Sequence, residues 1–127
     1  MGAHRTVDSR SADDLAAEAG RFDLIISTVN VKLDWNAYAA ALKPKGRLHL
    51  VGATVAPLDL GAFGLLMGQK SVSASPVGSP AVIATMLEFA ARHDIRPVVE
   101  TYPFEKVNEA MDRLRSGTAR YRIVLTR

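Results

Sequence analysis

The sequence predicts an α/β fold built on a parallel sheet. Short apolar runs typical of strands alternate along the chain with segments whose apolar residues recur at helical spacing. Glycine and proline stand at the boundaries between these segments, where they end regular structure. Alternation of strand and helix implies right-handed crossovers and parallel strands. With 127 residues, of which 48% are hydrophobic, the chain can bury a core.

The first elements are expected to be a strand, a helix and a second strand. Residues 5–8 are expected to form a short strand. Ser11 is a typical helix N-cap and Asp14 follows it three residues later, which predicts a helix over 13–19 that stops at Gly20. The apolar run over 22–28 then predicts a buried strand of a parallel sheet.

The next pair of elements is a helix and a strand. Four residues spaced as one helical face predict the helix: Trp35, Tyr38, Ala39 and Leu42. The sequence Pro-Lys-Gly over 44–46 is expected to end this helix. Residues 47–51 are expected to form the next strand, which Gly52 breaks.

A further helix and strand are predicted after Gly52. Asp59 is expected to cap a helix with Leu60, Phe63, Gly64 and Met67 on its inner face and Gly68 just past its end. Residues 70–75 then form another strand, in which Val72 and Ala74 face one side of the sheet and the serines face the other.

The last part of the chain predicts two more helices and two extended segments. Ser79 is a cap followed by proline at the first helical position. The helix that follows ends near His93, residues 97–102 are extended, a helix over 107–114 ends at Gly117, and 121–126 form the final strand. The elements after residue 94 are the ones expected to belong to a different layer.

Composition excludes several kinds of site. The chain has no cysteine, so disulfides, thiolate zinc sites and cysteine nucleophiles are excluded. The net charge of +3 comes from scattered basic residues and a cluster near the end of the chain, which is typical of a solvated end. The chain shows no basic stripe with interleaved aromatics and no apolar run of bilayer length. We therefore expect a cytoplasmic protein that binds neither nucleic acid nor membrane.

Six stretches of the sequence carry a resemblance to a known family. They read FDLIISTV (22–29), LKPKGRL (42–48), LVGA (50–53), SASPVGS (73–79), VNEAM (107–111) and RYRIV (120–124). In this order and spacing they resemble the zinc-dependent medium-chain alcohol dehydrogenases, in particular the cinnamyl alcohol dehydrogenase branch. The resemblance extends over 1–126 and implies a C-terminal fragment of that family.

The resemblance implies a fold and two domains. The fold is a partial Rossmann domain, a doubly wound parallel sheet that lacks its first two strands, over residues 1–94. Residues 95–127 are then a short α+β return segment of the catalytic domain. Two features of the family are missing: the glycine-rich pyrophosphate turn, since no G-x-G-x-x-G occurs, and the zinc ligands, which His4, His49 and His93 do not replace at any recognisable spacing.

The resemblance also implies a cofactor, NADP or NAD, and residues that would contact it. Ligands of such sheets bind beyond the carboxyl ends of the strands. The residues implied to face the cofactor are Thr28, Val29, Val51, Gly52, Ala53, Ala74, Ser75 and Arg122. The sequence leaves Gly52 as either a close backbone approach or a turn, and Arg122 as either a pyrophosphate ligand or a surface arginine. No catalytic or metal-binding residue is assigned.

Three functions remain open at this point. The resemblance favours the cofactor-binding part of a zinc-dependent alcohol or aldehyde oxidoreductase, expected to be inactive alone. Residues 22–27 and 42–48 also resemble later strands of methyltransferases that use a nucleoside-methionine cofactor. A non-catalytic dimerisation module is the third possibility, because dehydrogenases of this family often pair edge to edge. The strand that would pair, over 72–75, predicts a homodimer.

Overall fold

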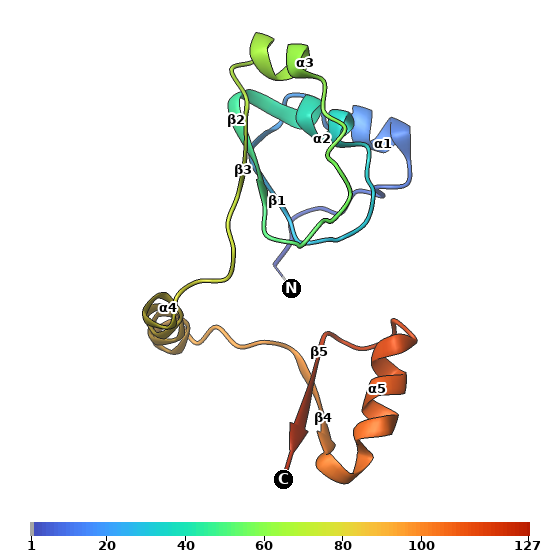
Figure 1. Ribbon diagram of the computed structural model, residues 1–127, viewed down its shortest axis with the longest axis vertical. Coiled ribbons are helices and arrows are strands. Elements are labelled where there is room, and N and C mark those ends of the chain that lie inside the picture. The colour runs from blue at the N-terminus through green and yellow to red at the C-terminus, as the bar shows by residue number, and fades with distance from the viewer. Residues whose placement is uncertain (1) are drawn as a thin grey trace. The chain divides into compact units, whose positions relative to one another are not determined.

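The computed structural model describes residues 2–127. The chain divides into two compact units, and the boundary between them falls between Val77 and Gly78 (Figure 1). The domain boundary at residue 94 was implied by the family resemblance and stays a prediction. Met1, the first residue of that expected domain, lies outside the described residues.

The first unit is a three-stranded parallel sheet, as the alternation of elements predicts. Its strands are β1 (Phe22–Ser27), β2 (Leu42–Leu50) and β3 (Ser71–Ala74), and their order in the sheet is β1-β2-β3. Its helices are α1 (Ala12–Ala16) before β1, α2 (Trp35–Ala41) between β1 and β2, and α3 (Ala62–Met67) between β2 and β3. The predicted α/β fold class is confirmed.

The core of this unit lies on one face of the sheet. Trp35, Leu42 and Leu48 form a buried cluster against which apolar residues of β1, β2, β3 and the loops pack. Leu24 and Ile26, which alternate with the inward-facing residues of β1, are 52% and 57% exposed. The sequence predicts β1 as a buried strand, but β1 is an edge strand and buries only one face.

The helix starts are explained by local hydrogen bonds, and one expected cap is wrong. The Ser11 hydroxyl accepts from the Asp14 amide at 3.2 Å, which confirms the predicted cap of α1. Asp59 does not cap α3, which begins after Gly61. Instead the Asn36 side chain amide donates to the Asp59 carbonyl at 3.0 Å and its oxygen accepts from the Gly61 amide at 2.8 Å. These two hydrogen bonds connect the loop before α3 to α2, and α3 starts later than expected.

Two strand predictions need correction. Residues 5–8 form no strand, because no neighbouring strand offers them a hydrogen-bonding partner within residues 2–127. Strand β2 begins at Leu42 rather than at Arg47, directly after α2. Lys45 has a φ of 64°, and the pairing with β1 shifts register before Leu24 and Arg47 become partners. The regular part of β2 therefore starts where the sequence predicts, and an irregular stretch precedes it.

The second unit contains a long helix and a two-stranded parallel sheet. Helix α4 (Pro80–Arg92) is capped by Ser79 with proline in its first turn, as predicted. Strands β4 (Val99–Pro103) and β5 (Arg122–Thr126) pair in parallel, and the single-turn η1 (Phe104–Lys106) and helix α5 (Val107–Arg115) connect them. Among the described residues, no helix is both long and apolar enough to cross a membrane.

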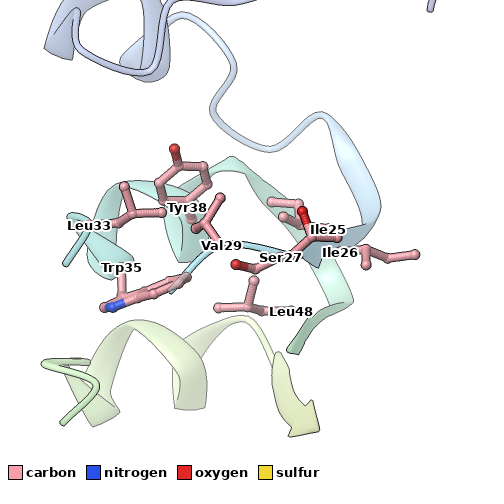
Figure 2. A pocket seen from close by; sticks show the side chains of 9 residues that line it. Ile25, Ile26, Ser27, Val29, Leu33, Trp35, Tyr38 and Leu48 are labelled. Carbon is pink, nitrogen blue, oxygen red and sulfur yellow. The ribbon is translucent and has the colours of Figure 1, made fainter. Parts of the chain in front are cut away.

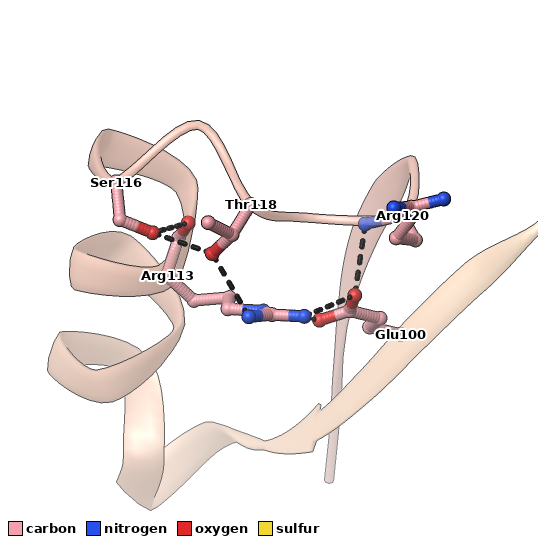
Figure 3. A network of polar contacts seen from close by, with 5 residues as sticks. All are labelled: Glu100, Arg113, Ser116, Thr118 and Arg120. Carbon is pink, nitrogen blue, oxygen red and sulfur yellow. Dashed lines mark hydrogen bonds and ion pairs between the residues drawn. The ribbon is translucent and has the colours of Figure 1, made fainter.

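A charged network joins α5 to β4 and to the segment just before β5 (Figure 3). The Arg113 guanidinium donates to both carboxylate oxygens of Glu100 on β4, at 3.0 and 3.1 Å. The same carboxylate accepts from the Arg120 amide, just before β5, at 2.8 Å. The Arg113 guanidinium, and then the Arg120 amide, hold the pKa of Glu100 below its usual range. One acidic side chain thus ties together three segments of the unit.

Candidate functional site

The carboxyl ends of the three strands of the first unit lie side by side. Ser27 on β1 pairs with Leu50 on β2, and Leu50 pairs with Ala74 on β3. The chain leaves each strand at this same edge, which we call the carboxyl edge. Ligands of open parallel α/β sheets bind in the crevice outside the carboxyl ends of the strands.

Gly52 makes the closest backbone approach at the carboxyl edge. Its amide donates to the Ser27 carbonyl at 3.2 Å. A Cβ atom at Gly52 would lie 2.5 Å from the Val29 carbonyl oxygen and 2.7 Å from the Thr28 carbonyl carbon. The Thr54 hydroxyl donates to the same Val29 carbonyl at 3.1 Å. The loops after β1 and β2 are therefore packed backbone to backbone, and glycine is required for this contact.

A histidine and two serines occupy the β3 end of the carboxyl edge. His49 pairs in register with Ser73, and its Nδ1 lies 2.8 Å from the Ser73 hydroxyl. Its Nε2 lies 3.0 Å from the hydroxyl of Ser75, whose amide donates to the Leu50 carbonyl at 3.2 Å. The two serines share one face of the sheet, as the alternation predicts. Ser75 is exposed, so its hydroxyl is available at the edge.

A small pocket of about 150 Å³ lies beside the β1 end of the carboxyl edge (Figure 2). Thr28, Val29 and the aromatic residues Trp35 and Tyr38 are among the residues that line it. Ser27 is 9% exposed and its hydroxyl has no hydrogen-bond partner among the described residues. No sequence pattern singles Ser27 out, because in the sequence it is only the last residue of an apolar run.

The structure gathers seven of the eight residues predicted to contact a cofactor. Those at the carboxyl edge are Thr28, Val29, Val51, Gly52, Ala53, Ala74 and Ser75. Arg122 belongs to the second unit, where it opens β5 and its amide donates to the Val98 carbonyl at 3.3 Å. A cofactor role for all eight residues stays a prediction. The sequence analysis did not single out Thr54, and it considered His49 only as a possible metal ligand.

The residues present do not form a zinc site. No group of three or more His, Cys, Asp or Glu side chains is arranged to hold a metal ion in residues 2–127. The three histidines lie on separate elements: His4 in a loop, His49 in β2, and His93 at the end of α4, where its ring lies 4.3 Å from that of Phe89. With no cysteine in the chain, the donor set does not fit catalytic or structural zinc.

Residues 1–125 match the model of a family described as zinc-binding dehydrogenase. The chain is 60% identical over 126 residues to the aldehyde reductase AdhA of Synechocystis, covering 99% of this chain and 38% of that protein. Among solved structures, the sorghum cinnamyl alcohol dehydrogenase SbCAD4 aligns with a TM-score of 0.89 and 36% identity, over 98% of this chain and 35% of that one.

A second solved structure comes from Helicobacter pylori. It is a protein titled CAD, complexed with NADP(H), and it aligns with a TM-score of 0.69 and 30% identity. This match covers 82% of our chain and 31% of the other. The chain thus spans about two fifths or less of the relatives it matches.

Proposed function

The chain belongs to the zinc-binding dehydrogenase family, and from this premise we propose that its carboxyl edge is one wall of a nicotinamide dinucleotide site in an alcohol or aldehyde oxidoreductase. One observation carries the proposal: the carboxyl ends of β1, β2 and β3 are in register, and the Gly52 backbone is packed against the loop after β1. This is the kind of edge at which parallel α/β sheets bind nucleotides.

The groups at the carboxyl edge suit parts of such a cofactor. Val29 and Val51 are 40% and 47% exposed there, and they offer apolar surface to a flat ring. The Ser75 hydroxyl and the backbone around Ala53 offer hydrogen bonds to a carboxamide. When bound, the nicotinamide accepts or gives a hydride. The residues of this chain would hold the ring in place and exclude water from one side of it.

The same residues give no route to zinc chemistry or to tight cofactor binding. The donor set of these residues does not fit zinc. The described residues also contain no glycine-rich turn for a pyrophosphate. We therefore propose that the chain alone has no alcohol dehydrogenase activity and binds NADPH or NADH more weakly than micromolar, which corresponds to less than about 8 kcal/mol of binding free energy.

A calorimetric titration with NADPH tests this proposal. Val51→Asp puts a negative charge at the carboxyl edge and removes the apolar side chain of valine, and should weaken binding about tenfold through repulsion of phosphate and lost apolar contact area. Leu66→Asp on α3 is the matched control, because Leu66 is also exposed but lies away from the strand ends. Equal effects of the two variants, or no heat with wild type at millimolar NADPH, would contradict the proposal.

A second candidate function, a dimerisation module, has an observation of its own. Among residues 2–127, β3 pairs with β2 alone, so one side of its backbone is an open edge. The Ser75 amide donates to β2, and backbone groups alternate in direction along a strand. The amides of Val72 and Ala74 therefore face the open edge. We propose that two copies of the chain pair along this open edge of β3. We also propose that the protein is located in the cytoplasm.

A further inference from the structure

His49 is hydrogen-bonded at both ring nitrogens; one partner, Ser73, lies on β3 and the other, Ser75, directly follows it. Nδ1 is 2.8 Å from the Ser73 hydroxyl and Nε2 is 3.0 Å from the Ser75 hydroxyl. On the other side of the ring its partner in register on β1 is Ile26, which offers no polar group. His49 and Ser73 are half-buried, whereas Ser75 is exposed at the carboxyl edge. The ring therefore connects a sheltered hydroxyl to an exposed one.

A neutral imidazole has one nitrogen that donates and one that accepts. The two serine hydroxyls must therefore play opposite roles. If Nδ1 carries the proton, it donates to Ser73, and the Ser75 hydroxyl donates its proton to Nε2. Ser75 can then only accept a hydrogen bond from a ligand. If Nε2 carries the proton, it donates to the Ser75 oxygen, and the Ser75 proton is free to be donated to a ligand.

We propose that His49 is a positioning residue whose tautomer sets the hydrogen-bond polarity of Ser75 toward the ligand of the carboxyl edge. The matching ligand chemistry is a primary carboxamide, which presents a carbonyl oxygen and an NH₂ group side by side. Ser75 meets the carbonyl in one tautomer and the NH₂ group in the other. This inference rests on the proposed function, because the nicotinamide cofactor is what brings a carboxamide to this edge.

A purely structural role for His49 makes a different prediction. If the ring only tied β2 to β3, the tautomer would be set by the protein alone and would not respond to a ligand. Coupling to the ligand requires that the hydroxyl of Ser75 exchange its role when the carboxamide binds, and Ser73 must then exchange its role as well. The ring nitrogens thus report on binding without touching the ligand.

The test is nitrogen NMR of the full chain labelled with ¹⁵N, at pH 8, where free imidazole is neutral. The ring signals of His49 are identified by their loss in His49→Gln. NADPH is titrated to about 5 mM, because the proposed dissociation constant lies above the micromolar range. Binding is followed at the Gly52 and Ala53 amides, and the tautomer at the two ring nitrogens. We expect the amides to shift and the tautomer ratio to change together, with one midpoint.

Two serine variants separate the Ser75 contact from general effects. Ser75→Ala should weaken NADPH binding about fivefold, the loss of one neutral hydrogen bond, and should leave the tautomer insensitive to NADPH. Ser71→Ala is the matched control: Ser71 is an exposed serine of β3 whose hydroxyl makes no hydrogen bond within residues 2–127, and it should change neither quantity.

Each outcome of the titration is decisive. If NADPH shifts the Gly52 and Ala53 amides while the His49 ring nitrogens stay constant, the inference is overturned and the proposed function stands. The same holds if Ser75→Ala and Ser71→Ala bind NADPH equally well. If NADPH shifts neither amide, the proposed function fails and the inference fails with it.

Discussion

Replacing Gly52 with alanine tests how the carboxyl edge is built. The added Cβ would lie 2.5 Å from the Val29 carbonyl oxygen, and 2.7 and 2.8 Å from the carbonyl carbon and oxygen of Thr28. These are backbone atoms, so no side chain can rotate away to make room. The loop after β1 must move instead, and the Gly52 amide, which donates to the Ser27 carbonyl at 3.2 Å, moves with it.

These contacts determine how much stability the Gly52→Ala substitution should cost. Forcing one methyl group into a packed region costs about 1–3 kcal/mol. Weakening one neutral backbone hydrogen bond adds about 1 kcal/mol. We therefore expect Gly52→Ala to lower the free energy of unfolding by about 2–4 kcal/mol. NADPH binding should weaken as well, because Thr28 and Val29 are displaced from the carboxyl edge.

Urea unfolding followed by tryptophan fluorescence measures this change. Trp35 is the one tryptophan of the chain and belongs to the buried cluster of the first unit. Gly64→Ala on α3 is the control: apart from its chain neighbours and the nearby backbone of its own helix, no atom lies within 4 Å of the added Cβ, and alanine in a helix is expected to stabilise by about 0.5–1 kcal/mol. A Gly52→Ala midpoint equal to that of wild type would refute the packing described for Gly52.

Three further predictions concern the core, the second unit and the open edge of β3. Leu48→Ala should lower the free energy of unfolding by about 2–5 kcal/mol in the same urea assay, because Leu48 is fully buried against Trp35 and Leu42. Glu100 has a lowered pKa in the fold, so its stabilising contribution is complete above the ordinary carboxyl pKa and is lost as pH falls through the lowered value. The urea midpoint read at the Ala110 amide should fall with pH in that acidic range, and it should fall less in Glu100→Gln. Proline at Val72 or Ala74 removes an amide that faces the open edge and should convert a dimer to a monomer in sedimentation equilibrium, whereas a wild-type monomer at high micromolar concentration would contradict the dimer proposal.

The direction of the backbone amides of β3 decides which proline substitution tests the dimer. From the sequence, Ser73→Pro is expected to weaken the dimer if the Ser73 amide points to the partner, because proline removes a backbone donor. The Ser75 amide donates to Leu50 on β2, and alternation places the Ser73 amide on the same side. Proline at Ser73 would therefore break the sheet itself. Which residues face a partner depends on hydrogen-bond direction, which the apolar pattern of a strand does not contain.

Local signals in the sequence predicted most elements correctly. The serine caps of α1 and α4, the apolar run of β1 and the alternating pattern of β3 are short-range features, and the structure confirms them. Burial was harder to predict. The apolar run over 22–28 predicted a buried strand, yet within residues 2–127 β1 has a neighbouring strand on one side only. Residues 5–8 form no strand for the same reason, because a strand requires a partner and not only a suitable sequence.

The site shows the same division between local and long-range features. The strand ends were expected from the sequence pattern, whereas their role as a cofactor edge was implied by the family resemblance and stays a prediction. The contacts of His49 with the two serines could not be predicted. They require that His49 pair with Ser73 and that the chain remain extended as far as Ser75. A shift of β3 by one residue would turn both serines to the other face and leave the ring without partners. The polarity of Ser75 toward a ligand is thus a property of sheet register, and it arises only when β2 and β3 are paired.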